Sequence, residues 1–196
     1  MTEQIKIMDM INRWGYLNLE QISLLLNKNI YTIQTHLTRL VKKKLITANK
    51  LTRKNIYVLS SSGNYYFGRK AHQIKINFNE LPHQDMMIKW LVAQTDIEHY
   101  QTERELKIDN GNLKWYPDLL IETSDNKNVL IECERTRKAK TRYKLIFDSM
   151  VSYLKQDYEC WWIVPNQAMA KFINERIKED NRCVEQHKVI LFNYIF

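Results

Sequence analysis

Apolar side chains recur with a helical period in three stretches of the first seventy residues: 4–14, 18–27 and 30–44. Gly15 can end the first stretch, and Asn18 with Gln21 three residues later matches a capping box at the start of the second. The polar sequence NKN separates the second stretch from the third. The pattern therefore predicts three helices, with a tight turn between the last two.

Two short β-prone pieces follow, 45–47 and 56–59, around a polar tip that carries Lys50, Arg53 and Lys54. We interpret them as a two-stranded wing. The whole pattern over residues 4–68 resembles a winged helix-turn-helix domain, in which the third helix enters the major groove and the wing touches phosphate. The outer face of the third helix carries side chains suited to base edges and phosphates: Tyr31, Thr32, Gln34, Thr35, Thr38, Arg39 and Lys42.

The charge of the chain is divided unevenly. Residues 1–70 contain 12 Lys and Arg against 3 Asp and Glu, net +9, whereas the remaining residues contain 18 against 19, net −1. A basic excess confined to one segment is typical of nucleic-acid binding. A winged helix that mediates only protein contacts is the alternative that the sequence leaves open.

Beyond residue 78 the pattern changes to alternating strands and helices. A helix is expected after Pro82, then strands over 99–108, 113–123 and 127–135, a helix over 141–156, a strand over 159–165, a helix over 166–180 and a strand over 188–196. The order αβββαβαβ predicts an α/β (α+β) unit with a mixed sheet. We therefore expect two domains, 1–72 and 78–196.

Three carboxylates fall close together in this second domain. If the strands over 113–123 and 127–135 pair antiparallel, Asp118 lies on one strand, while Glu132 and Glu134 project to one face of its neighbour. Their mutual repulsion would raise their pKa values unless a cation sits between them. Oxygen ligands in this arrangement suit Mg²⁺ or Mn²⁺.

These residues carry a family resemblance. Pro117-Asp118 followed after a hairpin by Glu132-Cys133-Glu134, within an αβββαβ order, resembles the PD-(D/E)XK restriction-endonuclease-like superfamily. The resemblance implies that Asp118 and Glu132 bind a metal ion that promotes phosphodiester cleavage. The third motif position, normally Lys, is Glu134, which becomes a further metal ligand. Lys144 is the first candidate to replace the motif lysine, and Lys138 is the second.

A basic run follows the carboxylates and includes Arg135, Arg137 and Arg142. It can neutralise phosphates brought toward the acidic site. The alternative is an ordinary solvated hairpin end whose acidic and basic residues neutralise one another.

A narrower resemblance joins both halves. The winged helix, the LPH sequence with His83, the TERELK sequence with Glu103, and the PD and ExE motifs resemble MobC-type plasmid relaxases and replication-relaxation proteins. The resemblance implies action at a plasmid transfer origin with other relaxosome proteins, and it makes His83 and Glu103 accessory site candidates. Helix capping or surface exposure is the simpler role for His83.

The sequence thus favours a metal-dependent DNA endonuclease of the relaxase type. The rival is a non-catalytic DNA-binding regulator or accessory protein with a degenerate nuclease-like domain, and Glu134 in the lysine position keeps that rival open. A homodimer is a further expectation. No stretch of about 18 apolar residues occurs, so we expect no membrane segment and a cytoplasmic location.

Overall fold

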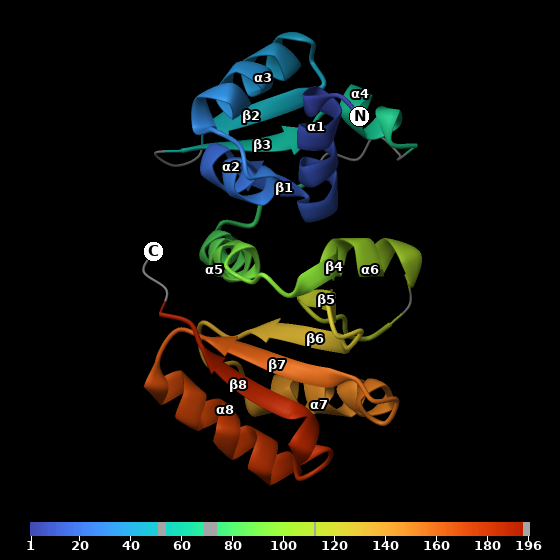
Figure 1. The fold of residues 1–196 in the computed structure, drawn as a ribbon, viewed down its shortest axis with the longest axis vertical. Helices are drawn as coiled ribbons and strands as arrows, with labels where there is room; N and C mark the ends of the chain where they lie inside the picture. Colours follow the sequence, from blue (N-terminus) through green and yellow to red (C-terminus); the bar gives the residue numbers. More distant parts are fainter. Residues whose placement is uncertain (51–53, 69–73, 112, 194–196) are drawn as a thin grey trace. The chain divides into compact units, whose positions relative to one another are not determined.

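A computed structural model of the chain describes residues 1–50, 54–68, 74–111 and 113–193. The chain forms two compact units, Met1–Leu81 and Pro82–Phe196, and the elements of each can be followed in Figure 1.

The first unit combines helices with a small antiparallel sheet. Its order is α1 (Glu3–Trp14), β1 (Tyr16–Asn18), α2 (Leu19–Leu26), α3 (Ile30–Lys42), β2 (Ile46–Lys50), β3 (Asn55–Leu59), α4 (Ser61–Tyr66) and a 3₁₀ turn η1 (Phe78–Glu80). The three expected helices and the two strands of the expected wing are present. Strand β1, which the sequence pattern did not predict, completes a sheet of order β1-β3-β2.

Local capping defines the helix-turn-helix. Gly15 ends α1 with φ 87°, a conformation that favours glycine. The predicted capping box is confirmed: the Gln21 backbone N–H donates to Asn18 Oδ1 at 2.9 Å, and the Asn18 N–H donates to Gln21 Oε1 at 3.0 Å. Asn27 then ends α2 in the left-handed region, and Asn29 caps α3. The turn between α2 and α3 is therefore determined by residues within it.

The buried stripe of α3 sets the direction of its polar face. Ile33, Leu37 and Leu40 are at most 1% exposed, and α3 packs against α1 and α2. Burial of one stripe leaves the opposite side of α3 at the surface.

The second unit is built on a five-stranded mixed sheet. Its elements are α5 (Leu81–Val92), β4 (Ile97–Thr102), α6 (Glu103–Asp109), β5 (Leu119–Thr123), β6 (Asn128–Cys133), α7 (Lys140–Leu154), β7 (Glu159–Val164), α8 (Gln167–Asp180), a 3₁₀ turn η2 (Val184–Gln186) and β8 (His187–Leu191). The sheet order is β4-β5-β6-β7-β8. β4, β5 and β6 pair antiparallel, whereas β6, β7 and β8 are parallel.

Consecutive tryptophans on β7 show that helices cover both faces of this sheet. Trp161 meets Trp90 of α5 edge to face at 6.5 Å, and Trp162 packs on Phe147 of α7 at 5.5 Å. Successive strand residues point to opposite faces, so α5 and α7 lie on opposite sides. Helix α8 shares the core of α7 through Ile173 and Ile177.

Some predicted boundaries were wrong. The strand expected over 99–108 ends at Thr102, where a capping box between Thr102 and Glu105 starts α6. The strand expected over 113–123 begins only at Leu119, and the strand expected over 188–196 begins at His187 and ends at Leu191. Positions 194–196 of that prediction lie outside the described residues. A mixed sheet is present as predicted, but this topology alone does not identify a nuclease domain, and the restriction-endonuclease-like assignment is not confirmed.

Within the described residues, no helix is long and apolar enough to cross a membrane.

Gly63 in α4 provides a test of packing in the first unit. A Cβ atom at this position would lie 2.1 Å from the Leu45 carbonyl oxygen, a contact that only a backbone shift can relieve. We expect Gly63→Ala to lower the free energy of unfolding by about 1–3 kcal/mol, measured by urea denaturation. The control is Gly111→Ala, where the nearest atom is 3.7 Å away; equal stability of the two variants would contradict the prediction.

Candidate functional site

The outer face of α3 is exposed along its length. Every side chain predicted to contact DNA on this helix is at the surface: Tyr31, Thr32, Gln34, Thr35, Thr38, Arg39 and Lys42. Tyr31 is 76% exposed, which is high for an aromatic side chain. An exposed helix face of this composition can enter a major groove without rearrangement of the core.

The hydroxyls of this face are partly committed to the helix itself. Thr35 Oγ1 donates to the Tyr31 carbonyl at 3.0 Å, and Thr38 Oγ1 donates to the Gln34 carbonyl at 2.9 Å. These threonines can therefore offer a lone pair or a methyl group to a base. Gln34, Arg39 and Lys42 supply the donors of the same face.

The wing adds positive charge at the end of β2 and the start of β3. Lys50 is exposed, and Lys54 pairs with Glu20 at 2.5 Å. Both partners of that pair are more than half exposed, so the pair is weak and a phosphate can replace Glu20. Arg53, the third predicted wing residue, lies outside the described residues.

The three predicted carboxylates do come together in the second unit. Strands β5 and β6 pair with Leu119 opposite Ile131, so Asp118, just before β5, faces Glu132. The Cys133 backbone N–H donates to Asp118 Oδ2 at 2.7 Å. Glu132 and Glu134 are 2% and 0% exposed. These buried carboxylates therefore need compensation from within the chain.

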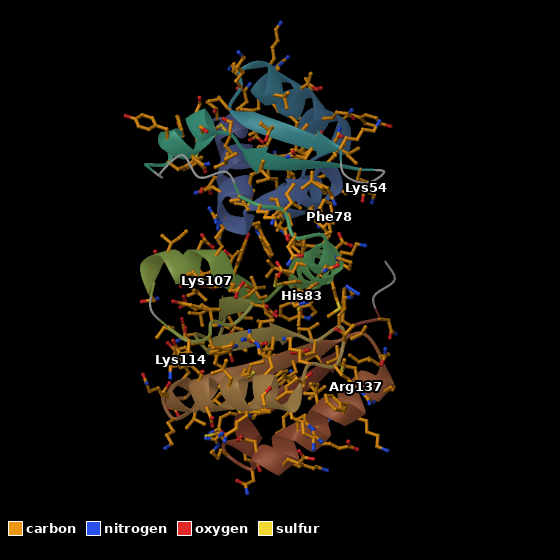
Figure 2. The ribbon with its side chains drawn as sticks, turned by 180° about the vertical axis from the view of Figure 1, so that it is seen from behind. Lys54, Phe78, His83, Lys107, Lys114 and Arg137 are labelled. Carbon is orange, nitrogen blue, oxygen red and sulfur yellow. The ribbon has the colours of Figure 1, made fainter. Side chains whose placement is uncertain are left out.

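Two cations of the chain supply that compensation. His83, near the start of α5, places Nε2 3.2 Å from Asp118 Oδ1 (Figure 2). Lys138, in the loop after β6, places Nζ 2.5 Å from Glu134 Oε1 and 3.9 Å from Glu132 Oε2. His83, Asp118, Glu132, Glu134 and Lys138 form a connected set, which we call the buried ion network.

Two aromatic side chains complete the buried ion network, and neither is among the candidate site residues predicted from the sequence. Trp115 Nε1 donates to Glu132 Oε1 at 3.1 Å, and the Tyr143 hydroxyl donates to Glu134 Oε2 at 3.4 Å. Trp115 stands three residues before Asp118, but nothing in that spacing identifies it as a donor. These aromatic donors reach the carboxylates because the strands and α7 pack together, and the sequence pattern does not specify that packing.

The pKa shifts follow from this arrangement. Asp118 raises the pKa of His83 above 6.5 against the opposing effect of burial. Burial would raise the pKa of Asp118, but the charges of His83 and Lys138 and the Cys133 N–H hold it below 3.8. Burial and then Asp118 raise the pKa of Glu132 well above 4.5, and burial raises the pKa of Glu134 despite Lys138.

These directions identify Glu132 as the carboxyl best suited to hold a proton. With Glu132 neutral, the charges of Asp118 and Glu134 balance those of His83 and Lys138. The buried ion network is then neutral, as buried groups require. Five of its six carboxylate oxygens lie within 3.4 Å of a donor of the chain itself, and the sixth, Glu132 Oε2, lies 3.9 Å from Lys138 Nζ.

The remaining predicted site residues lie apart from this network. Lys144, the first candidate to replace the motif lysine, is exposed on α7, and Lys138 takes the position instead. Glu103, expected on a strand, begins α6 and pairs with Lys107 at 2.5 Å. Arg142 is exposed, Arg135 is partly exposed, and Arg137 lies over the Phe172 ring at 4.7 Å.

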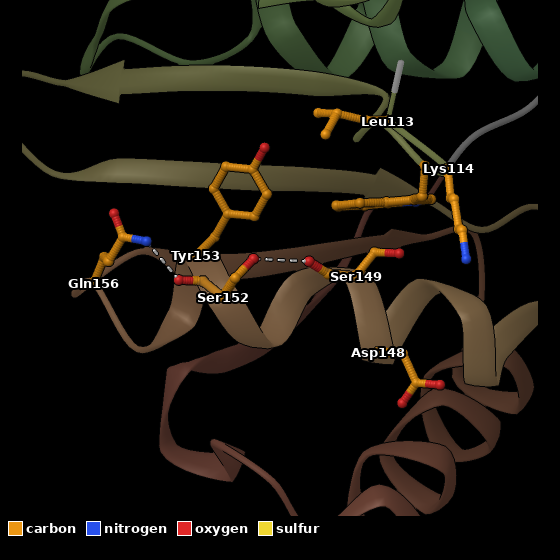
Figure 3. Close-up of a pocket in the computed structure, with 8 residues that line it drawn as sticks. Leu113, Lys114, Asp148, Ser149, Ser152, Tyr153 and Gln156 are labelled. Atoms are coloured by element: carbon orange, nitrogen blue, oxygen red, sulfur yellow. Dashed lines mark hydrogen bonds between the residues drawn. The ribbon is translucent and has the colours of Figure 1, made fainter. Parts of the chain in front are cut away.

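A separate pocket of about 500 Å³ lies along α7 (Figure 3). Trp115 and Tyr153 contribute its aromatic surface. Two of its polar side chains hydrogen-bond carbonyls of α7: Ser152 donates to the Ser149 carbonyl at 3.3 Å, and Gln156 donates to the Ser152 carbonyl at 2.8 Å. Because specific ligand sites rely on convergent polar groups, we assign no ligand to this pocket.

The comparison with protein families points to a regulator. A family model described as Penicillinase repressor matches residues 2–106. A search of curated proteins finds no match to the chain.

This match corrects the enzymatic interpretation. The relaxase and PD-(D/E)XK identification was wrong, because the matching family is one of repressors. The expected Mg²⁺ or Mn²⁺ cofactor was also wrong: among the described residues, no group of three or more His, Cys, Asp or Glu side chains could hold a metal ion. The physical reason is that Lys138 and His83 occupy the positions next to the carboxylates where a cation was expected. The relaxosome partners and the transfer origin lose their basis with the relaxase.

The ion pair of Lys138 and Glu134 gives a stability prediction. Lys138→Met leaves the buried Glu134 carboxylate uncompensated, so we expect the free energy of unfolding to fall by about 3 kcal/mol, the lower end for breaking a buried pair. Urea denaturation measures this loss, and adding Glu134→Gln should recover part of it. Lys144→Met, on the exposed side of α7, should change stability by only about 0.5 kcal/mol. Equal losses in the two Met variants would contradict the role of Lys138.

The pair of His83 and Asp118 gives a pH prediction. Because the pKa of His83 is raised in the folded state, its stabilisation is complete below 6.5 and is lost as pH rises through the folded pKa. Because the pKa of Asp118 is lowered, the same pair is also lost as pH falls below 3.8. Between pH 3.8 and pH 6.5, we expect wild type to be more stable than His83→Gln by about 1.5 kcal/mol. This difference should shrink as pH rises further.

Burial lowers the pKa of His187 to about 4, so this side chain also makes stability depend on pH. Its effect is the same in wild type and in the variant and therefore cancels in the difference. The exposed His99 supplies the control. A His99→Gln variant with the same pH dependence as His83→Gln would contradict the assignment.

Residues 2–106, which the repressor model matches, are more than half of the 196 residues. They include all of α1 to α4, the exposed α3 face and the wing strands. The chain belongs to the penicillinase repressor family.

Proposed function

We propose that this protein is a transcriptional repressor that binds a specific duplex DNA site through its first unit. The exposed polar face of α3 is the observation that carries the proposal, since it lies within the segment that the repressor family model matches. In this reading α3 lies in the major groove, and Lys50, Arg53 and Lys54 of the wing meet phosphates. This is the non-catalytic regulator that the sequence left as the rival of an endonuclease.

Charge and geometry support DNA over a purely protein partner. The net charge of +9 lies within residues 1–70. Arg39 and Lys42 on the α3 face are exposed, and the pair that Lys54 of the wing forms with Glu20 is exposed too. Phosphate attraction supplies most of the non-specific affinity of such proteins, and base contacts supply the specificity.

For the second unit we propose a structural and regulatory role without catalysis, and we treat residues 1–72 and 78–196 as separate domains. The balanced buried ion network favours a scaffold, because its charged groups are directed at one another.

A homodimer stays a prediction, supported by the pairing of helix-turn-helix proteins on two half-sites. Analytical ultracentrifugation of the full chain, with and without DNA, measures it.

Arg39 and Lys42 on α3 provide the test of DNA recognition. Selection from a pool of randomised duplexes should enrich one sequence. Arg39→Ala should weaken binding to that sequence by about 1–3 kcal/mol if Arg39 reads a base. Lys42→Ala should weaken binding to all duplexes and lower the slope of log Kobs against log salt by about 0.9 if Lys42 meets a phosphate.

Lys75→Ala is the matched control, because Lys75 is an exposed cation of the first unit outside the helix-turn-helix and the wing strands. Enrichment of no sequence, together with equal effects of the three variants, would contradict the proposal and favour a protein-binding winged helix.

A further inference from the structure

The segment Arg135–Lys144 of the second unit, which we call the basic segment, contains six Lys and Arg and no Asp or Glu. It does not reflect a generally basic unit, since residues 71–196 have a net charge of −1. It also lies outside residues 2–106, which the repressor family model matches. A local concentration of one sign of charge creates a field that attracts an oppositely charged partner.

The structure divides these six cations into two groups. Lys138 is turned inward to Glu134 and Glu132, and Arg137 is held over the ring of Phe172 in α8. Arg135 is partly exposed, whereas Lys140, Arg142 and Lys144 are exposed in the first turns of α7. Among the described residues, none of these last three forms an ion pair with a carboxylate. The inward lysine serves the buried ion network, and the outer cations are available to a partner.

The position of the exposed cations on α7 is unfavourable for the helix alone. The first turn of α7 has no acidic residue, and its N-cap, Ala139, gives no side-chain hydrogen bond. Positive side chains at a helix N-terminus oppose the helix dipole. Lys140 and Lys144 lie four residues apart on one side of α7, and an anion bound between them would remove that conflict, so the charges are better explained by a partner than by stability.

The chemistry of the segment favours a nucleic-acid backbone over an anionic membrane. The residues between its cations are Thr136, Ala139, Thr141 and Tyr143, and Tyr143 is buried. The segment therefore has no large exposed apolar side chain to insert among lipids. Arginine and lysine on one helix start match phosphates, which accept bidentate arginine and point-charge lysine contacts.

We propose that the basic segment is a second DNA-contact surface, which binds backbone phosphates without reading sequence while the first unit supplies specificity. The proposal rests on the proposed DNA-binding function. It adds contacts from a unit that the repressor family model covers only up to residue 106. Sequence-independent phosphate contacts raise affinity for all duplexes and make it more sensitive to salt.

The test compares two pairs of lysines in the full chain. Lys140→Ala/Lys144→Ala removes two charges from the start of α7. Lys155→Ala/Lys178→Ala removes two exposed lysines just after α7 and in the last turn of α8. Helix α7 follows β6, and α8 follows β7, which is parallel to β6. The C-terminal ends of both helices, near Lys155 and Lys178, therefore lie away from the start of α7, which carries Lys140 and Lys144. The net charge change is the same in the two variants.

Binding to the selected duplex and to an unrelated duplex of equal length is measured from about 50 to about 200 mM salt. We expect the Lys140/Lys144 variant to lower the slope of log Kobs against log salt by about 1.8 on both duplexes, because each phosphate contact contributes about 0.9. The Lys155/Lys178 variant should keep the wild-type slope. Thermal unfolding should show that the first variant is at least as stable as wild type, since it removes charges that oppose the helix dipole.

Equal slopes for wild type and both variants would overturn this inference, and so would binding of wild type to vesicles of anionic phospholipid that the Lys140/Lys144 variant loses while its DNA slope is unchanged. The proposed function fails separately. It is contradicted if wild type binds no duplex or if Arg39→Ala and Lys42→Ala leave DNA binding intact.

Discussion

The second unit depends on the compensation of two carboxylates buried in its interior, Glu132 in β6 and Glu134 directly after it. Glu132 and Glu134 are almost fully buried beside a strand in the middle of the sheet. The free energy of burying an uncompensated charge in such a position would exceed the net stability of a domain. Lys138, His83, Trp115 and Tyr143 reach these carboxylates, or Asp118 beside them, from a loop, a helix start, the approach to β5 and α7. The packing of these four segments on the sheet is therefore tied to one set of polar contacts.

The same contacts explain why a cluster of acids in a DNA-binding protein need not be a nuclease site. Its carboxylates face cations that belong to the chain, and the pKa directions place the spare proton on Glu132. A buried ion network of this kind favours one arrangement of its segments over others, although it adds little net stability compared with apolar packing. That role is consistent with the scaffold proposed for the second unit.

Positive charge is used differently in the two units. In the first unit, cations and hydrogen-bonding side chains share the exposed face of α3, which suits the reading of bases. In the second unit, the exposed cations occupy one helix start without neighbouring amide side chains, which suits phosphates alone. A member of the penicillinase repressor family with both surfaces would combine specific recognition with additional sequence-independent affinity.

Features that depend on neighbours a few residues apart could be predicted from the sequence alone. The capping box of Asn18 and Gln21, the end of α1 at Gly15 and the buried stripe of α3 follow from local hydrogen bonding and helical periodicity. The proximity of Asp118 to Glu132 also followed, since a hairpin brings its two strands together. The capping box of Thr102 and Glu105, which starts α6 where the sequence pattern predicts a continuing strand, is a local feature as well.

The cations that meet the carboxylates depend on contacts between segments distant in sequence. His83 is distant in sequence from Asp118. The sequence favoured Lys144 over Lys138 as the lysine beside the carboxylates, but the path of the loop after β6 turns Lys138 inward and leaves Lys144 in solvent. Side-chain direction in a loop depends on contacts with distant segments, which local patterns do not encode. Whether the acids would bind a metal ion or cations of the chain itself was therefore settled by packing, because a motif specifies residue types and the fold specifies their partners.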